Sequence, residues 1–147
     1  MKKGDICFLI DDDFDDQEIF SLALEKVDPT LTCITANSGL EALQKLADER
    51  LSIPDYIFLD LNMPRMNGKE CLTEIRKYDR LKNIPVVIYS TSSMKNEIAE
   101  TVKLGATDFI VKPYSMTDLI DELNRFFQKR LKNPGQTIAK DNGFGDE

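Results

Sequence analysis

Apolar runs of strand length alternate along the chain with stretches in which apolar residues recur at helical spacing. The apolar runs occupy residues 6–10, 31–36, 55–59, 85–89 and 107–111. Between and after them, apolar positions lie three or four residues apart, which is the spacing of one face of a helix. Repeated β-α units of this kind predict an α/β fold, in which a parallel sheet carries helices on both faces.

The first and last helices carry the most regular apolar stripes. These stripes consist of Phe20, Ala23, Leu24 and Val27 in the first helix and of Leu119, Leu123, Phe126 and Phe127 in the last. In the second helix, Ser38 and Glu41 have the spacing of a capping box. The inward face expected from that start holds Leu40, Leu43, Leu46 and Ala47.

Polar residues with reactive side chains follow the apolar runs. Asp11 and Asp12 follow the first run, Asp60 the third, Ser90 the fourth and Lys112 the fifth. Right-handed crossovers place the carboxyl ends of all parallel strands at one edge of a sheet, where open α/β sheets bind their ligands. We therefore expect three carboxylates, a hydroxyl and a lysine from distant segments to meet at that edge.

The composition narrows the chemistry that this edge can perform. The chain of 147 residues has no histidine, which excludes Ser-His-Asp and Cys-His nucleophiles and HExxH zinc sites. A formal net charge of −7 argues against a nucleic-acid binder, and no apolar run is long enough to cross a membrane. Cys7, Cys33 and Cys71 show no CxxC spacing, so we expect buried thiols and a cytoplasmic location.

The residues at the predicted edge suit phosphoryl transfer. Three carboxylates favour a hard divalent cation such as Mg²⁺, whose shell is completed by water and phosphate oxygens. Lys112 would offset the remaining negative charge and pair with a phosphoryl group, and Ser90 would donate a hydrogen bond to the same group. A carboxylate beside a cation, an ammonium and a hydroxyl is prepared to act as a nucleophile.

The stretch LIDDDFDD places five carboxylates within positions 11–16. Like charges so close together repel one another. We assign Asp11 and Asp12 to the sheet edge. We assign Asp13, Asp15 and Asp16 to the start of the first helix, where acidic side chains accept backbone N–H bonds and complement the dipole for ~0.3–1 kcal/mol each. On this division only the first pair has a functional role.

Four separated motifs together carry a family resemblance. They are Asp11-Asp12, LDLNMPRMNG around Asp60, the hydroxyl of Ser90, and DFIVKPY around Lys112. In this order they resemble the receiver domain of two-component response regulators. The resemblance implies a doubly wound, CheY-like α/β fold with five parallel strands in the order 2-1-3-4-5 and five helices. It covers about residues 5–130, and we expect a stand-alone receiver domain at residues 1–131. Residues from Asn133 onward are polar and show no period, so we expect a polar tail at residues 132–147.

The resemblance also implies a role for each residue of the site. Asp60 would accept a phosphoryl group from a phosphohistidine of a sensor histidine kinase or a histidine phosphotransfer protein. Asp11, Asp12, Asp60 and the backbone carbonyl of Asn62 would hold Mg²⁺, with Mn²⁺ as an alternative. Lys112 would contact the phosphoryl group together with the hydroxyl of Ser90.

Switching would follow phosphorylation in a protein of this family. Ser90 and Phe109 would move together and change the face formed by the fourth helix, fifth strand and fifth helix, to which an output partner binds. The bond between Lys112 and Pro113 would be cis, an isomer accessible mainly before proline. Such a protein catalyses only its own phosphorylation and dephosphorylation. It needs no direct contact with nucleic acid or membrane, and its apolar last helix allows a homodimer.

Three positions depart from the common pattern of the family. Thr91 stands where Ala or Gly is frequent, and its bulk would narrow access to Asp60. Ser90 replaces the commoner Thr and keeps the hydroxyl. Phe109 replaces the frequent Tyr, so switching would rely on ring packing without a phenol.

Two other functions fit part of the pattern. A haloacid-dehalogenase-type phosphatase also forms an aspartyl phosphate, and Asp11-x-Asp13 superficially resembles its nucleophile pair. Against it, Asp15 stands where a hydroxyl or apolar residue is expected, and no late acidic pair follows Lys112. A phosphorylation-independent interaction module would keep the fold, but such modules usually lose at least one of the site residues that this chain retains.

Overall fold

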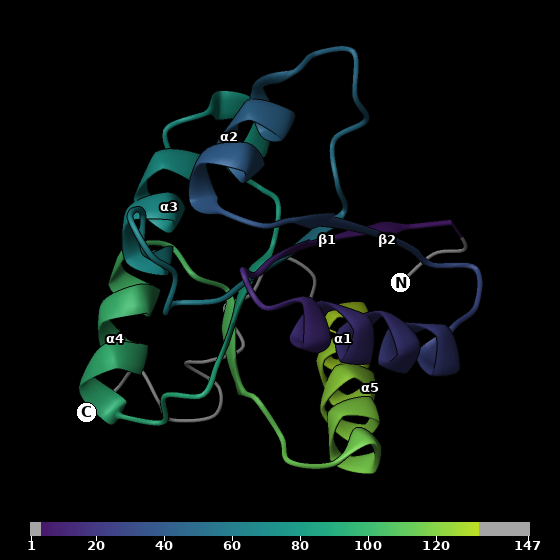
Figure 1. Cartoon of the computed structure of the whole chain (residues 1–147). Helices are drawn as coiled ribbons and strands as arrows, with labels where there is room; N and C mark the ends of the chain where they lie inside the picture. Colours follow the sequence, from purple (N-terminus) through teal and green to yellow (C-terminus); the bar gives the residue numbers. More distant parts are fainter. Residues whose placement is uncertain (1–3, 133–147) are drawn as a thin grey trace.

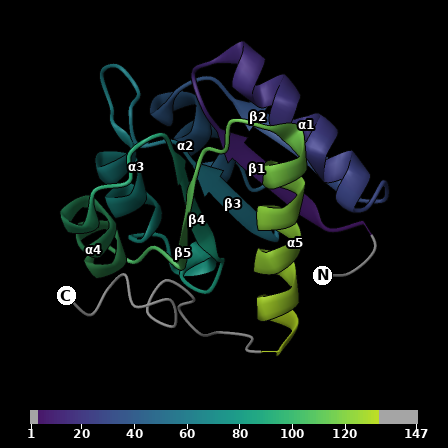
Figure 2. The ribbon, with the colours of Figure 1, turned by 90° about the horizontal axis from the view of Figure 1, so that it is seen from below.

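The computed structural model describes residues 4–132. Within this range, five parallel strands form one sheet in the order β2-β1-β3-β4-β5 (Figures 1 and 2). The strands are β1 (Ile6–Ile10), β2 (Thr32–Ala36), β3 (Tyr56–Leu59), β4 (Val86–Ser90) and β5 (Asp108–Val111). The fold class and the strand order expected from the sequence are therefore confirmed.

Helices cover both faces of the sheet. They are α1 (Phe14–Val27), α2 (Gly39–Ala47), α3 (Gly68–Ile75), α4 (Lys95–Lys103) and α5 (Met116–Lys132). Helices α1 and α5 lie on one face, and α2, α3 and α4 lie on the other (Figure 1). Helix α5 includes the first residue of the predicted tail, and the rest of that tail lies outside the described residues. None of the described helices combines the length and apolar character needed to span a bilayer.

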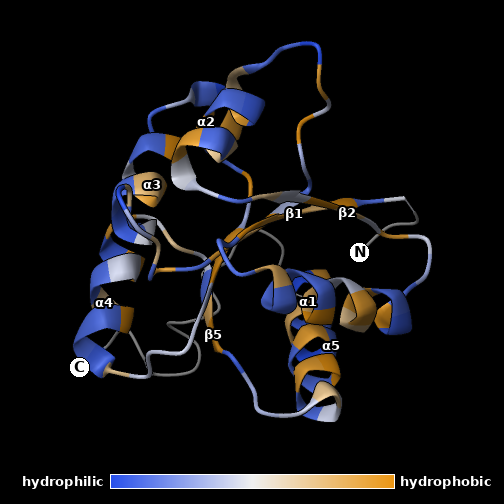
Figure 3. Ribbon diagram, viewed as in Figure 1, coloured by the Kyte–Doolittle hydropathy of each residue, from blue (hydrophilic) through white to orange (hydrophobic). Residues whose placement is uncertain are grey.

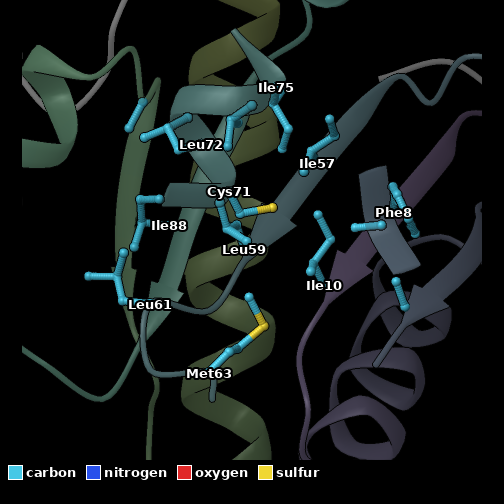
Figure 4. Packing of buried hydrophobic residues seen from close by; sticks show 14 of the residues in the cluster. Phe8, Ile10, Ile57, Leu59, Leu61, Met63, Cys71, Leu72, Ile75 and Ile88 are labelled. Atoms are coloured by element: carbon cyan, nitrogen blue, oxygen red, sulfur yellow. The ribbon is translucent and has the colours of Figure 1, made fainter. Parts of the chain in front are cut away.

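Each face of the sheet has its own apolar layer. Between the sheet and α1 and α5 the layer is rich in aromatic rings: the centroid of Phe58 lies 4.8 Å from that of Phe20 and 5.8 Å from that of Phe126. On the other face the layer is mainly aliphatic, and Leu72 and Ile75 of α3 pack against the central strands (Figure 4). In Figure 3, β1 and much of α5 are accordingly coloured hydrophobic. The stripes predicted for α1 and α5 thus form the core.

The buried face of helix α2 differs from the face predicted from the sequence. Its buried side chains are those of Ala42 and Leu46, while Leu40 is 61% exposed. The small Gly39 and Ala42 face inward because the helix lies close to its neighbours: a Cβ atom on Gly39 would lie 2.8 Å from the Met66 sulfur. Ser38 caps the helix by accepting the Glu41 N–H at 3.0 Å, but the Glu41 carboxylate accepts from Asn37. The reciprocal half of the predicted capping box is therefore absent.

A 3₁₀ turn, η1 (Asp79–Leu81), was not predicted from the sequence. Arg76 holds this turn from the end of α3. Its guanidinium donates to the carbonyls of Leu81 at 3.0 Å, Ile84 at 2.9 Å and Gly105 at 2.9 Å. Burial lowers the pKa of Arg76, but a guanidinium remains charged in proteins. One side chain thus fixes the loops before β4 and β5, at the sheet edge where those strands begin.

Candidate functional site

The strand register brings the predicted site residues to one edge of the sheet. Ile10 and Leu59 are partners in β1 and β3, and the residues that follow them are Asp11 and Asp60. The Asp60 N–H donates to the Ile10 carbonyl at 3.0 Å, which fixes the ends of these strands against each other. At the other side of the site, the Lys112 N–H donates to the carbonyl of Ser90 at 2.8 Å. Neighbouring strand ends therefore supply the carboxylates and the cation.

Three carboxylates form a cluster at this edge. Oxygens of Asp11, Asp12 and Asp60 all lie within 4.8 Å of one another. Asp11 and Asp60 are buried, whereas Asp12 is exposed. Hard oxygen donors at this spacing fit Mg²⁺ or Mn²⁺, and the exposed member leaves the cluster open to solvent for entry of the ion. The structure brings together the carboxylates that the sequence predicted as a metal site.

Lys112 is the cation of the site, and its side chain is 9% exposed. Its Nζ lies 2.9 Å from Asp11 Oδ2, 2.8 Å from Asp16 Oδ2 and 3.6 Å from Asp60 Oδ2. Burial acts to lower the pKa of Lys112, but hydrogen bonds to Asp16 and Asp11 outweigh it and the pKa is raised. The ammonium is therefore charged at neutral pH and stands beside the Asp60 carboxylate.

The acidic residues at positions 11–16 do not all have the roles that the sequence predicted. Asp13 is the N-cap of α1 and accepts the N–H groups of Asp15 and Asp16 at 2.9 and 3.2 Å, as expected of a helix start. The assignment of Asp16 to the helix start alone was wrong, because its carboxylate contacts Lys112. Asp16 lies in the first turn of α1, at the end of the helix that directly follows the strand end carrying Asp11. The position of the first turn beside the predicted site was the available signal for this contact.

The pKa of the Asp60 carboxyl is raised above its ordinary value. Burial raises its pKa to about 6, Lys112 opposes this shift, and the neighbouring Asp11 and Asp12 carboxylates add to it. Burial also raises the pKa of Asp11, against the effect of hydrogen bonds from the Asp13 N–H and Lys112. A bound cation favours the ionised forms, so metal binding and deprotonation of these carboxyls reinforce each other.

In metal-free buffer, we expect Asp60→Asn to be more stable than the wild type at neutral pH. The native state keeps the Asp60 proton up to about pH 6, whereas the carboxyl ordinarily ionises near 3.8. The native state thus binds more protons between these values, and the wild type loses stability as pH rises through this window. Urea unfolding in the presence of EDTA should give the variant a free energy of unfolding roughly 3 kcal/mol higher than that of the wild type at about pH 7.5. Most of this difference should vanish near pH 4.5, and an equal difference at both pH values would contradict the prediction.

Ser90 lies within β4, one residue further along the strand than expected, and is fully buried. Its hydroxyl accepts the Ser92 N–H at 3.3 Å and lies 3.5 Å from the Asn62 amide nitrogen. Phe109 on the neighbouring strand is 4% exposed and belongs to the aliphatic layer. Thr91, the next residue along the chain, is exposed. The hydroxyl and the ring thus occupy adjacent strands beneath the carboxylate cluster.

The peptide bond between Lys112 and Pro113 is trans, so the expected cis bond was wrong: the described residues contain no cis peptide. The trans isomer is the lower in energy before proline, by ~0.5–1 kcal/mol. The cis expectation came from the family resemblance and not from a feature of these residues. Lys112 makes its contacts with Asp11 and Asp16 with the trans bond in place.

Gly68 supports the backbone that carries Asp60, a role the sequence did not reveal. The loop after β3 turns back so that the Gly68 N–H donates to the Leu61 carbonyl at 2.9 Å. A Cβ atom at Gly68 would lie 2.3 Å from the Asp60 carbonyl oxygen and 2.6 Å from the Leu61 Cα. Atoms do not approach so closely, so only glycine allows α3 to begin against the strand end that holds Asp60.

A parallel α/β domain with an acidic cluster and a lysine at the carboxyl edge is the arrangement of a signalling receiver. The sequence of the chain matches the response regulator receiver domain over residues 7–124. The chain therefore belongs to the response regulator receiver domain family.

Individual proteins show the same likeness. Chemotaxis protein CheY of Thermotoga maritima is 34% identical over 90 residues, which are 61% of this chain and 71% of that protein. Sensor histidine kinase CheAY of Helicobacter pylori is 36% identical over 110 residues, which are 75% of this chain and 13% of that protein. A CpxR homolog of Haemophilus influenzae, a transcriptional regulatory protein, is 34% identical over 131 residues, 89% of this chain and 53% of that protein. The chain thus spans about half or less of the last two proteins.

Solved structures agree with this family. The phosphorylated cyanobacterial phytochrome response regulator RcpA superposes with a TM-score of 0.77 and 31% identity, covering 84% of this chain and 91% of that one. The Mn²⁺-bound form of response regulator Rcp1 gives a TM-score of 0.76 and 26% identity, covering 88% of this chain and 96% of that one. The likeness extends over nearly the whole of both structures.

Proposed function

We propose that the chain is a signalling phosphoacceptor, in which Asp60 takes a phosphoryl group from a phosphohistidine in a reaction that requires a divalent cation. One observation carries the proposal. Asp60 is 5% exposed and belongs to a cluster whose carboxylate oxygens lie within 4.8 Å of one another, with the Lys112 ammonium at 3.6 Å. A carboxylate among these partners has a cation beside it that can offset the charge of a phosphoryl group.

In the proposed reaction, an Asp60 carboxylate oxygen attacks phosphorus in line with the bond to the donor histidine nitrogen. That bond breaks, and the nitrogen keeps its electron pair and takes up a proton. Lys112 lies beside the attacking oxygen and offsets the charge of the phosphoryl oxygens. The Ser90 hydroxyl donates a hydrogen bond to one of them.

The cation would be held by Asp11, Asp12, Asp60 and the carbonyl of Asn62. When bound, Mg²⁺ or Mn²⁺ neutralises phosphoryl oxygens and helps to orient them. The close carboxylate cluster supports this site, and so does the Mn²⁺-bound form of the similar regulator Rcp1. The likeness to the sensor histidine kinase CheAY supports a phosphohistidine donor.

The phosphoryl group would act through a switch at Ser90 and Phe109. When the Ser90 hydroxyl turns from Ser92 toward the phosphoryl group, the packing above Phe109 changes. The affected surface is formed by α4, β5 and α5. An output partner or a second copy of the chain binds to this surface. Thr91 tunes the access of small donors. The chain acts in this way as a cytoplasmic receiver that catalyses only its own phosphorylation and dephosphorylation.

The phosphatase alternative finds little support in the site. Its second acid would be Asp13, but the Asp13 side chain caps α1 through the N–H groups of Asp15 and Asp16. The acid that such an enzyme needs beside its nucleophile is therefore committed to helix capping.

Peptide mapping after phosphorylation tests the proposal. The protein is incubated with Mg²⁺ and acetyl phosphate, or with a phosphohistidine protein, and the site of the added phosphoryl mass is located. We expect label on Asp60 when Mg²⁺ is present and no label when EDTA is added before the donor. Label on Asp11 would support the phosphatase instead. Absence of label with every donor would support the phosphorylation-independent module.

A further inference from the structure

Lys112 is held by two carboxylates besides the proposed phosphoacceptor. An ammonium has three N–H donors, and the short contacts of Lys112 Nζ are to Asp11 at 2.9 Å and Asp16 at 2.8 Å. Asp60 lies further away, at 3.6 Å. The third donor therefore remains for an oxygen that arrives between Lys112 and Asp60, which is where a phosphoryl oxygen would lie.

We propose that Asp16 is a positioning residue for phosphoryl transfer, which together with Asp11 fixes the Lys112 ammonium and holds it back from Asp60. This inference rests on the proposed function of Asp60. A carboxylate in direct contact with an ammonium is a poorer nucleophile and a poorer metal ligand, because the ammonium occupies its lone pairs. Asp16 keeps the Asp60 oxygen available and the Lys112 N–H oriented before the donor arrives.

The position of Asp16 separates this role from helix capping. Asp13 already supplies the N-cap of α1, since its side chain accepts two N–H groups of the first turn. Asp15 lies in the same turn and is exposed. The Asp16 side chain is 32% exposed and its carboxylate reaches the buried Lys112. Asp15 and Asp16 thus share the helix-dipole effect, and only Asp16 has the contact with Lys112.

The negative charge of Asp16 and its contact with Lys112 would affect the rate of phosphorylation in opposite directions. Acetyl phosphate is an anion, so removal of a nearby negative charge favours its approach. If Asp16 acted only through its charge, its removal would leave phosphorylation unchanged or faster. If Asp16 positions Lys112, its removal lets the ammonium move to Asp60 and makes phosphorylation slower. The two explanations predict opposite results.

The test compares Asp16→Ala, Asp16→Asn and the matched control Asp15→Ala in the full chain. Initial rates of phosphorylation are measured over a range of acetyl phosphate concentrations at saturating Mg²⁺. We expect the maximal rate of Asp16→Ala to fall about tenfold, that of Asp16→Asn, which keeps an oxygen acceptor, about threefold, and that of Asp15→Ala less than twofold. The half-saturating donor concentration should stay the same, and the thermal midpoints of the two alanine variants should agree.

The outcomes distinguish the inference from the proposed function. If the wild type is labelled at Asp60 and Asp16→Ala reacts as fast as Asp15→Ala, or faster, the inference alone is overturned. An equal loss in both alanine variants also overturns it, because the helix start would then explain the effect. If the wild type takes up no label from any donor, the proposed function fails and the inference fails with it.

Discussion

Asp60→Asn is expected to take up no phosphoryl group from acetyl phosphate or from a phosphohistidine protein. The substitution keeps the size of the side chain but replaces the nucleophilic carboxylate by a neutral amide, and it removes one anionic ligand of the cation cluster. We expect the rate of phosphorylation to fall at least about a thousandfold, the scale seen when a nucleophile is removed. Mass spectrometry of the intact protein over a time course measures this loss.

Two controls give this result its meaning. Asp15→Asn changes the same functional group on the exposed start of α1 and should be phosphorylated at the wild-type rate. The stability of Asp60→Asn in urea shows that loss of label does not come from unfolding, since removal of a buried charge should stabilise the metal-free protein. Label that persists in Asp60→Asn would place the acceptor at another residue and contradict the proposed function.

Gly68→Ala is expected to lower the free energy of unfolding by about 3 kcal/mol or more. The new Cβ would lie 2.3 Å from the Asp60 carbonyl oxygen, and a backbone atom cannot move aside as a flexible side chain can. Insertion of a methyl group into packed surroundings typically costs about 1–3 kcal/mol, and contact with backbone lies at the upper end of this range. The displaced strand end carries Asp60, so phosphorylation should slow as well. Urea unfolding and the phosphorylation assay measure the two effects.

Gly39→Ala is the matched control for this prediction. Gly39 and Gly68 each begin a helix directly after a polar N-cap residue. The Cβ at Gly39 would meet only side-chain atoms of Met66, the nearest at 2.8 Å, and this unbranched side chain can move. We expect Gly39→Ala to change stability by less than about 1 kcal/mol. Equal destabilisation by both substitutions would show that the contact with the Asp60 backbone is not the cause.

The fold and most of the site could be predicted because they follow from order along the chain. Apolar runs and helical spacing gave the β-α units, and the handedness of crossovers placed every strand end at one edge. Asp11, Asp60 and Lys112 meet there because each follows a strand directly. Such residues are positioned by the backbone, so the sequence predicts their meeting without any knowledge of side-chain conformation.

The features that were missed depend on contacts between side chains or on close packing. The bond between Asp16 and Lys112 joins a helix to a distant strand end and depends on the rotamers of both residues. The inward face of α2 follows from the small residues that allow its close approach, and not from the largest apolar side chains. Gly68 showed the composition of a turn, but its close contact with the Asp60 backbone appears only in three dimensions. The trans bond at Pro113 corrects an expectation taken from the family.

The order in which the site residues occur has a consequence for biosynthesis. Asp11, Asp12, Asp16 and Asp60 are all translated before Lys112, which follows the last strand. Domains generally fold as units, so this sheet is completed only when β5 and the residue after it have been made. The carboxylates of Asp11 and Asp60 are therefore buried in the same step that supplies the Lys112 ammonium, which offsets their charge.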